Sequence, residues 1–441
     1  MRGKIVCITL MMAFAPLWTF AANVTDEGGA GRLTFTKDVL PILQENCQSC
    51  HRPQGANLSG MIAPMSLMTY EEVRPWAKAI ARSVEAKAMP PWDASQLTHG
   101  VFKNERTLTD DQIATIASWV SSGAARGNSA DAPAPKLFEN TGWQLSDKLG
   151  EPDMLLKMNE PFWVADEVRD IQPRIEIKLT KEQMPEKRWV RAIEYRPGSE
   201  VVHHVVGYSI PPGEDDNFTN GSNFGQIASG TDPQNYEEGY GLPLLPESKI
   251  VLSMHYHKEI GPGTGAYDQT ELAVWFHDKP VSHVLESSPI AHGDFEIPPM
   301  AKSWRVGGAK TWDDDFVVLE LLPHMHLRGS AAKYTAYYPD GTSEVLLDVP
   351  KYLYEWQTSY EYANYKHMPA GTRVEWEIRY DNSPEMAAER NFDSNLAVRF
   401  GGPTTDEMDL GWMTWCYAKE GKAPDSYAEK NAEHEDSHGT D

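Results

Sequence analysis

Two cysteines and a histidine lie close together near the start of the chain, in the run Cys47-Gln48-Ser49-Cys50-His51. Thiols at this spacing can add across the two vinyl groups of haem, and the histidine that follows can present its imidazole to the iron. The alternative is a redox C-x-x-C motif that happens to precede a histidine, but such motifs accompany a βαβ pattern, which is not found here. We therefore expect one covalent haem c, bound by Cys47, Cys50 and His51.

The iron needs a second axial ligand, which should be a methionine or histidine downstream of His51. Met89 follows a helical stretch, 73–86, and precedes Pro90-Pro91, which fixes an extended loop. We expect Met89 to be this ligand, and the alternatives are Met61, Met65, Met68 and His99. A histidine and methionine pair raises the haem potential, which suits electron transfer.

Further along the chain, three groups of histidines lie in apolar runs that are rich in β-formers. They are His203-His204, His255-Tyr256-His257 and His324-Met325-His326. A histidine in such a run is expected to be partly buried, so hydrogen bonds or a metal ion must satisfy its ring nitrogens.

The faces of a strand decide which of these histidines can act together. Residues two apart share a face, so His324 and His326 would lie side by side while Met325 packs on the opposite face. Adjacent residues face opposite sides, so His203 and His204 can share one metal only if the strand bulges there.

The haem motif needs helices around it, and its flanks predict them. Residues 36–45 have a helical pattern with Thr36 as a candidate N-cap, although Pro41 would kink or shorten this helix. Thr109 and Gln112 form a capping box that opens a second amphipathic helix. A first and a last helix packed around haem is the plan of small c-type cytochromes, so we predict an all-α cytochrome c domain over residues 30–127.

Beyond a small, polar linker at 128–141, the helical pattern fades and short β-rich runs recur. They include 190–195, 201–210, 272–277, 333–338 and 374–380. This spacing predicts two antiparallel β-sandwich domains of jelly-roll-like form, at 142–287 and 288–420. An acidic tail at 421–441, which holds His434 and His438, is expected to be disordered.

The N-terminus and the overall charge bear on location and partners. Residues 1–22 have a basic start, a short apolar core and small residues at the end, as in a secretory signal, although an uncleaved anchor is the alternative. We expect a periplasmic or secreted protein that does not span the membrane once the signal is cleaved. The net charge of −24 argues against nucleic-acid binding. With Cys47 and Cys50 assigned to haem, Cys416 is unpaired and no disulfide framework is expected.

The order and the local contexts of the histidine groups resemble those of the copper type II, ascorbate-dependent monooxygenases, the family of the peptidylglycine and dopamine hydroxylases. The resemblance covers about residues 142–420 and implies two β-sandwich domains, each with one copper. It implies that the first copper is bound by His203, His204 and His255. It implies that the second copper, the catalytic one, is bound by His324, His326 and Met408.

The chain departs from this family in a few places. The animal enzymes carry several disulfides in these domains, and none is available here. His257 shares a strand face with His255, so either could bind the first copper, although the family context favours His255. Met413 is a rival of Met408, which the Phe-Gly-Gly and Glu-Met context favours.

These features together predict an exported copper monooxygenase that uses O₂ to hydroxylate a C–H bond of a small organic substrate. It would be an oxidoreductase acting on paired donors, with electrons supplied through the fused haem domain. Ascorbate or a periplasmic redox protein would be the external donor, and we expect the haem to pass electrons to the copper of the first β-domain. The alternative is a non-catalytic periplasmic haem protein that transfers electrons or binds copper.

Overall fold

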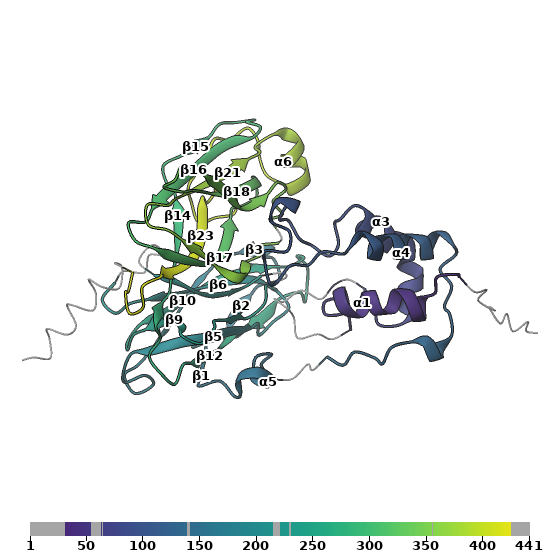
Figure 1. Ribbon diagram of the computed structural model, residues 1–441, viewed down its shortest axis with the longest axis horizontal. Coiled ribbons are helices and arrows are strands. Elements are labelled where there is room, and N and C mark those ends of the chain that lie inside the picture. Colours follow the sequence, from purple (N-terminus) through teal and green to yellow (C-terminus); the bar gives the residue numbers. More distant parts are fainter. Residues whose placement is uncertain are drawn as a thin grey trace, which may run out of the picture.

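The structure, a computed structural model, describes residues 31–53, 63, 65–138, 142–214, 221–228, 231–354 and 356–424. The predicted signal at 1–22, Met61 and most of the acidic tail, with His434 and His438, lie outside these residues. The protein is multidomain, with helices in the N-terminal part and several small sheets after them (Figure 1). No helix among the described residues is both long and apolar enough to cross a membrane.

The N-terminal part is a small helical domain. Its helices are η1 (Phe35–Val39), α1 (Leu40–Asn46), α2 (Tyr70–Val73), η2 (Arg74–Trp76), α3 (Ala77–Glu85), η3 (Gln96–Thr98), α4 (Asp110–Ser121) and η4 (Ser129–Asp131). The apolar faces of α1, α3 and α4 share one core, in which Leu43 and Trp119 are fully buried. Thr109 and Gln112 form the predicted capping box at the start of α4.

The first helix differs from its prediction at two points. Thr36 is not an N-cap, because the chain enters the helix at Thr34, whose backbone is extended, and Thr36 is buried within the first turn. The α-helix is shorter than expected, because α1 begins at Leu40 after η1, and Pro41 lies in its first turn, where its missing N–H is not needed.

The first β-region, after α5 (Ser146–Leu149), holds two larger sheets. One has the order β1 (Met154–Lys157), β12 (Glu271–Phe276), β5 (Arg188–Arg196), β9 (Tyr240–Leu244) and β13 (His283–Val284), with β8 (Gln234–Asn235) on β5. The other has the order β3 (Asp170–Ile171), β10 (Lys249–His257), β6 (Val202–Ile210) and β7 (Ser222–Ile227), with β4 (Arg174–Lys178) paired to β10. A separate two-stranded sheet is formed by β2 (Phe162–Val164) and β11 (Ala266–Asp268). Side chains of both larger sheets, such as Val274 and Leu252, meet in one core.

The second β-region repeats this plan. One sheet has the order β14 (Glu286–Ala291), β23 (Leu410–Tyr417), β17 (Phe316–His324) and β20 (Tyr360–Met368). The other has the order β16 (Trp304–Thr311), β21 (Arg373–Tyr380), β18 (Gly329–Tyr337) and β19 (Ser343–Val349). A separate pair is formed by β15 (Glu296–Ile297) and β22 (Val398–Arg399), and the helix α6 (Pro384–Arg390) follows β21 in the chain. Residue 288, the expected start of this region, lies inside β14. Cys416 is fully buried, as expected of a small apolar side chain.

Glu320 on β17 is a buried carboxylate beside another one. It lies opposite Glu361 in the pairing of β17 with β20, and burial, together with the charge of Glu361, raises its pKa to about 7. Because this folded pKa is above the ordinary value of 4.5, the stability that Glu320 contributes is full below about pH 4.5 and is lost as the pH rises through about 7.

Replacing Glu320 with glutamine should therefore stabilise the protein more at pH 8 than at pH 5. The ceiling of the gain is about 3 kcal/mol, from a pKa raised by two to three units. Thermal unfolding of the variant at both pH values measures it, with Glu389→Gln on the exposed face of α6 as the control. An equal change of Tm at both pH values would contradict the expectation.

Candidate functional site

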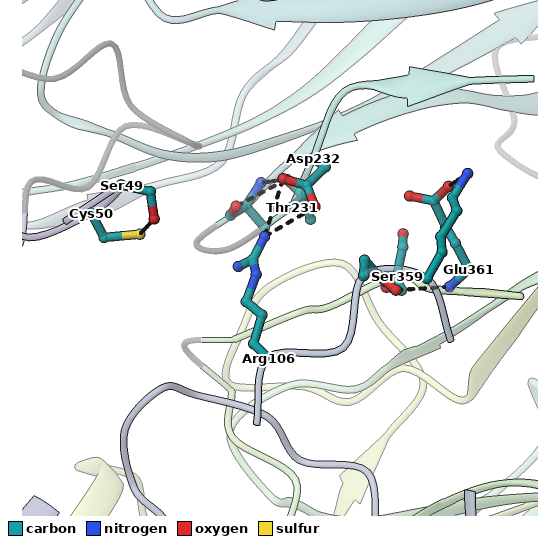
Figure 2. Close-up of polar contacts among 10 residues, drawn as sticks. Ser49, Cys50, Arg106, Thr231, Asp232, Ser359 and Glu361 are labelled. Carbon is teal, nitrogen blue, oxygen red and sulfur yellow. Dashed lines mark hydrogen bonds and ion pairs between the residues drawn. The ribbon is translucent and has the colours of Figure 1, made fainter. Parts of the chain in front are cut away.

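The haem motif lies just after α1, beside the core of the helical domain. Cys47 and Cys50 are free, partly buried thiols, and Ser49 Oγ lies 3.8 Å from Cys50 Sγ (Figure 2). Burial, followed by the nearby Cys50, raises the pKa of Cys47 to about 12. Two thiols that are not joined in a disulfide, beside the apolar core of the helices, are the donor set that a haem c requires.

The imidazole of His51 is oriented by one backbone contact. Its Nδ1 lies 3.2 Å from the carbonyl oxygen of Met65, which can accept a hydrogen bond from it. The carbonyl thus selects the tautomer that leaves Nε2 free to bind iron. Burial lowers the pKa of His51, which also favours the neutral ring that a metal needs.

Met89 lies after α3 and is 39% exposed. It lines a cavity of about 630 Å³ between α3, α4 and residues 350–353 of the second β-region, and His51 is not among the described residues that line this cavity. His99, an alternative ligand, instead lies 2.5 Å from the carboxylate of Glu105. Met89 therefore stays a prediction for the second axial ligand.

His203, His204 and His255, called the first histidine group from here on, converge on one point. His204 lies opposite His255 in the pairing of β6 with β10, and the next pair joins Val202 to Tyr256, so His203 is the extra residue of a bulge. This bulge is the irregularity that two adjacent histidines need to face the same side.

The ring nitrogens of these histidines are at a distance suited to one metal ion. The Nδ1 atoms of His203 and His204 are 3.2 Å apart, and those of His204 and His255 are 3.4 Å apart. Nitrogen ligands about 2.0 Å from one ion, at angles near tetrahedral, are about 3.3 Å apart. Burial, and then the neighbouring imidazoles, lower the pKa of His203 to about 4 and that of His204 well below its usual value. Both rings are therefore neutral at pH 7, as metal ligands must be.

Asp170 on β3 was not identified from the sequence, yet it orients His255. Its carboxylate lies 2.6 Å from Nε2 of His255, which leaves Nδ1 directed at His204. The same carboxylate lies 3.3 Å from Nδ1 of His257, whose side chain is 45% exposed. Burial would raise the pKa of Asp170, but the hydrogen bonds from the two histidines outweigh it and hold the pKa far below its ordinary value.

Replacing Asp170 with asparagine should lower the copper affinity of this cluster about 10-fold to 100-fold, because carboxylates behind a ligand fix its orientation and raise its basicity. A competitive titration with a chromophoric chelator measures the affinity. Asp153→Asn is the control because Asp153, which directly precedes β1, accepts a hydrogen bond from the backbone N–H of Phe276 in the sheet that does not carry these histidines. Equal affinity in D170N and D153N would rule out this role.

His324 and His326, called the second histidine group from here on, lie at the end of a strand, which corrects the expectation that they sit within one. His324 is the last residue of β17 and His326 lies in the turn that follows. The two rings are nonetheless adjacent, with centroids 5.4 Å apart, and Met325 between them is fully buried in the core, as expected. Gln357 places Oε1 2.8 Å from Nδ1 of His324, which leaves Nε2 of that ring available.

Glu407 ties this turn to the segment that carries Met408. Its carboxylate accepts hydrogen bonds from the backbone N–H of His326 at 2.8 Å and of Arg328 at 2.6 Å. Burial raises the pKa of Glu407 to about 8. Burial, and then the nearby His324, lower the pKa of His326 to about 3, so its ring is neutral at pH 7. Glu407, the residue before Met408, thus fixes the backbone of His326 and Arg328, which lie about 80 residues earlier in the sequence.

One cavity of about 460 Å³ joins the two groups. Its lining includes His204 from the first group and His324, His326 and Met408 from the second. Polar and aromatic side chains complete it, among them Gln172, Arg174, Tyr208, Ser253 and Tyr354. Met413, the rival of Met408, is 1% exposed in the core of the second region and does not reach this cavity.

Comparisons with known proteins identify the N-terminal part. Residues 41–124 match the model of the cytochrome c family, so the chain contains a cytochrome c domain, which supports haem c and haem-mediated electron transfer. No curated protein matches the sequence.

Solved structures that share some similarity with this chain are distant. The VP2 subviral particle of infectious bursal disease virus is 11% identical, over 60% of this chain and 72% of that one, at a TM-score of 0.19. A putative secreted protein from Eubacterium rectale is 9% identical, over 56% and 68%, at a TM-score of 0.17. Similarities this low carry no argument about fold or function.

Proposed function

We propose that this chain is a copper monooxygenase with its own cytochrome c domain. The observation that carries the proposal is the single cavity lined by His204, His324, His326 and Met408. Two sheets that share a core in each β-region suit the two β-sandwich domains that the resemblance implies. A periplasmic or secreted location is part of the same proposal, since covalent haem attachment and the signal-like N-terminus suit export.

The two ligand sets suit different tasks. His203, His204 and His255 offer three imidazoles, which suit a copper that changes oxidation state without binding substrate. His324, His326 and Met408 offer two imidazoles and a soft thioether, which stabilises Cu(I) and is a poor ligand set for zinc. Copper in the second site would supply O₂ activation for insertion of one oxygen atom into a C–H bond.

The residues around the cavity prepare it for this task. Gln357 orients the imidazole of His324, and the carbonyl of Asp406 lies 3.2 Å from Nδ1 of His326. Asp170 orients the imidazole of His255 in the same way. The cavity holds a small organic substrate, with polar groups such as Ser253 and Tyr208 to orient it. Haem c, held by Cys47, Cys50 and His51 with Met89 as the proposed second ligand, would supply one-electron transfer.

Metal analysis followed by an O₂-uptake screen tests the function. We expect about two coppers and one haem per chain, and O₂ uptake that depends on both a reductant and an organic substrate. Bound copper without uptake across a broad panel of substrates would favour the non-catalytic electron-transfer protein instead.

The role of the haem domain can be tested apart from the copper sites. Replacing His51 or Met89 should slow turnover with a periplasmic redox protein as donor by about 10-fold or more, because the haem loses an axial ligand. Turnover driven by ascorbate should stay within about 2-fold of the unaltered protein. An equal loss with both donors, in a variant shown by circular dichroism to be folded, would contradict an electron-supplying role.

A further inference from the structure

A loop of the cytochrome domain, residues 92–106, connects α3 to α4, contains η3 and docks on the second β-region; it is called the arm here. It pairs with β20 through two backbone hydrogen bonds, from Lys103 N to Glu361 O at 2.8 Å and from Ala363 N to Val101 O at 3.0 Å. A third, from Ser95 N to Asp348 O at 2.7 Å, ties the arm to β19. The arm is therefore held by an isolated β-bridge between Phe102 and Tyr362 and by the added hydrogen bond to β19.

Side chains strengthen this docking. Phe102 is 3% exposed and belongs to the core of the second β-region, against which Trp92 also packs. Lys103 forms an ion pair with Glu361 at 2.5 Å, and Asn104 donates to the carbonyl of Ser359 at 2.7 Å. Figure 2 shows Ser359 and Glu361 beside the arm. A buried aromatic and a half-buried ion pair imply a permanent interface.

Aromatic rings connect the arm to the strand that holds the second histidine group. Trp92 meets Tyr360 edge to face, with centroids 5.0 Å apart, and Phe102 lies 5.4 Å from the same ring. Tyr360 lies opposite Leu321 on β17, and His324 follows Leu321 by three residues, a rise of about 10 Å along the strand. Upstream of Tyr360, Gln357 contacts His324 and Tyr354 lines the cavity.

The contact of the arm with the first β-region lies elsewhere. Arg106 forms an ion pair with Asp232 at 3.1 Å (Figure 2). Asp232 precedes β8, which belongs to the sheet of β5, whereas His203, His204 and His255 lie on β6 and β10 of the other sheet. The strand that follows Asp232 therefore belongs to the sheet that does not carry the first histidine group.

We propose that electrons leave the cytochrome domain through Trp92 and Tyr360 and enter the second histidine site directly. The proposal rests on the proposed function and revises the expected order, in which the first copper is reduced by the haem. In each transfer one electron leaves ferrous haem, which becomes ferric, and reduces Cu(II) at His324, His326 and Met408 to Cu(I). No atom or proton needs to move between the two centres.

Transient reduction of the copper-loaded protein tests this route. A flash-excited reductant delivers less than one electron per chain, and haem absorbance then reports how fast the haem is reoxidised within the chain. Trp92→Leu and Tyr360→Leu should slow this rate at least about 10-fold, because the aromatic contact is lost. Trp92→Phe, which keeps a ring, should restore most of the rate, and Trp76→Leu, at an exposed tryptophan of the same domain, should leave it unchanged.

Variants of the copper sites decide between the two entry points. With the first site removed by His204→Ala, haem reoxidation should persist, whereas His324→Ala should abolish it. The reverse pattern would overturn the proposal, as would an unchanged rate in both Trp92→Leu and Tyr360→Leu.

Two further measurements distinguish a failure of this electron route from undocking of the arm and from a failure of the proposed function. Protection of the Lys103 and Ala363 amides from hydrogen exchange reports the docking of the arm without any metal, and should persist in Trp92→Phe. Loss of this protection in Trp92→Leu would show that the arm had undocked, and the comparison of His204→Ala with His324→Ala then carries the test. Absence of copper from the unaltered protein would overturn the proposed function, whereas copper reduced only through the first site would overturn this route alone.

Discussion

Replacing Met408 with leucine is expected to abolish O₂-dependent hydroxylation while leaving the haem spectrum unchanged. Leucine keeps the volume but removes the thioether that would stabilise Cu(I) next to His324 and His326. Changes to residues behind a ligand already cost about 10-fold to 100-fold, so loss of a ligand should cost more than about 100-fold in activity. Oxygen uptake with ascorbate and a substrate found by the screen measures the activity, and X-ray absorption of the reduced protein should lose its sulfur ligand.

Met413 provides the matched control for this experiment. It lies five residues further along the chain and is buried in the core on β23. Met413→Leu conserves volume, so it should cost less than about 1.5 kcal/mol of stability and leave copper binding intact. Full activity and an unchanged sulfur signal in M408L would show that Met408 is not the ligand.

The second large effect is expected at His255 and His257, which are both candidates for the third ligand of the first copper. His255→Ala should reduce bound copper from about two per chain to about one, because Nδ1 of His255 faces His204 at 3.4 Å. His257→Ala should keep both coppers, because Nδ1 of His257 faces Asp170 and its side chain is half exposed. Metal analysis after dialysis gives the stoichiometry, and paramagnetic resonance of Cu(II) shows which site is lost.

This pair of variants carries its own control, since both remove an imidazole from the same strand, β10. Loss of copper in H257A with retention in H255A would reverse the assignment. Loss in both would mean that Asp170 and His257 belong to the binding site itself, which the cluster of Asp170, His255 and His257 also allows geometrically.

The features of this protein that the sequence predicts well are those set by residues close together in the chain. The haem motif spans five residues, and the capping box at Thr109 spans four, so local spacing alone specifies them. The bulge at His203 was expected only on the condition that His203 and His204 share one metal, and the pairing of β6 with β10 is what shows it. Strand-rich runs after residue 142 are likewise visible in composition, since β-branched and aromatic residues favour strands.

The residues that orient the histidines were missed because their partners are distant in the chain. Asp170 is 85 residues from His255, and Glu407 is 81 from His326. A lone aspartate or glutamate has no spacing pattern that marks it as a partner of a particular histidine. Glu407 had one indirect signal, because it precedes Met408, but its contact with the turn after β17 was invisible.

The sequence by itself determined that a haem binds near the N-terminus, that β-structure follows, and which histidines were candidates for a metal. Short-range chemistry is enough for each of these, because covalent attachment, strand preference and ring nitrogens belong to the residues themselves. Only the tertiary structure decided that the two histidine groups border one cavity and that the arm from Trp92 to Arg106 docks beside the second group. Those facts depend on how sheets pack and which strand a loop joins, and burial of distant apolar side chains such as Phe102 sets both.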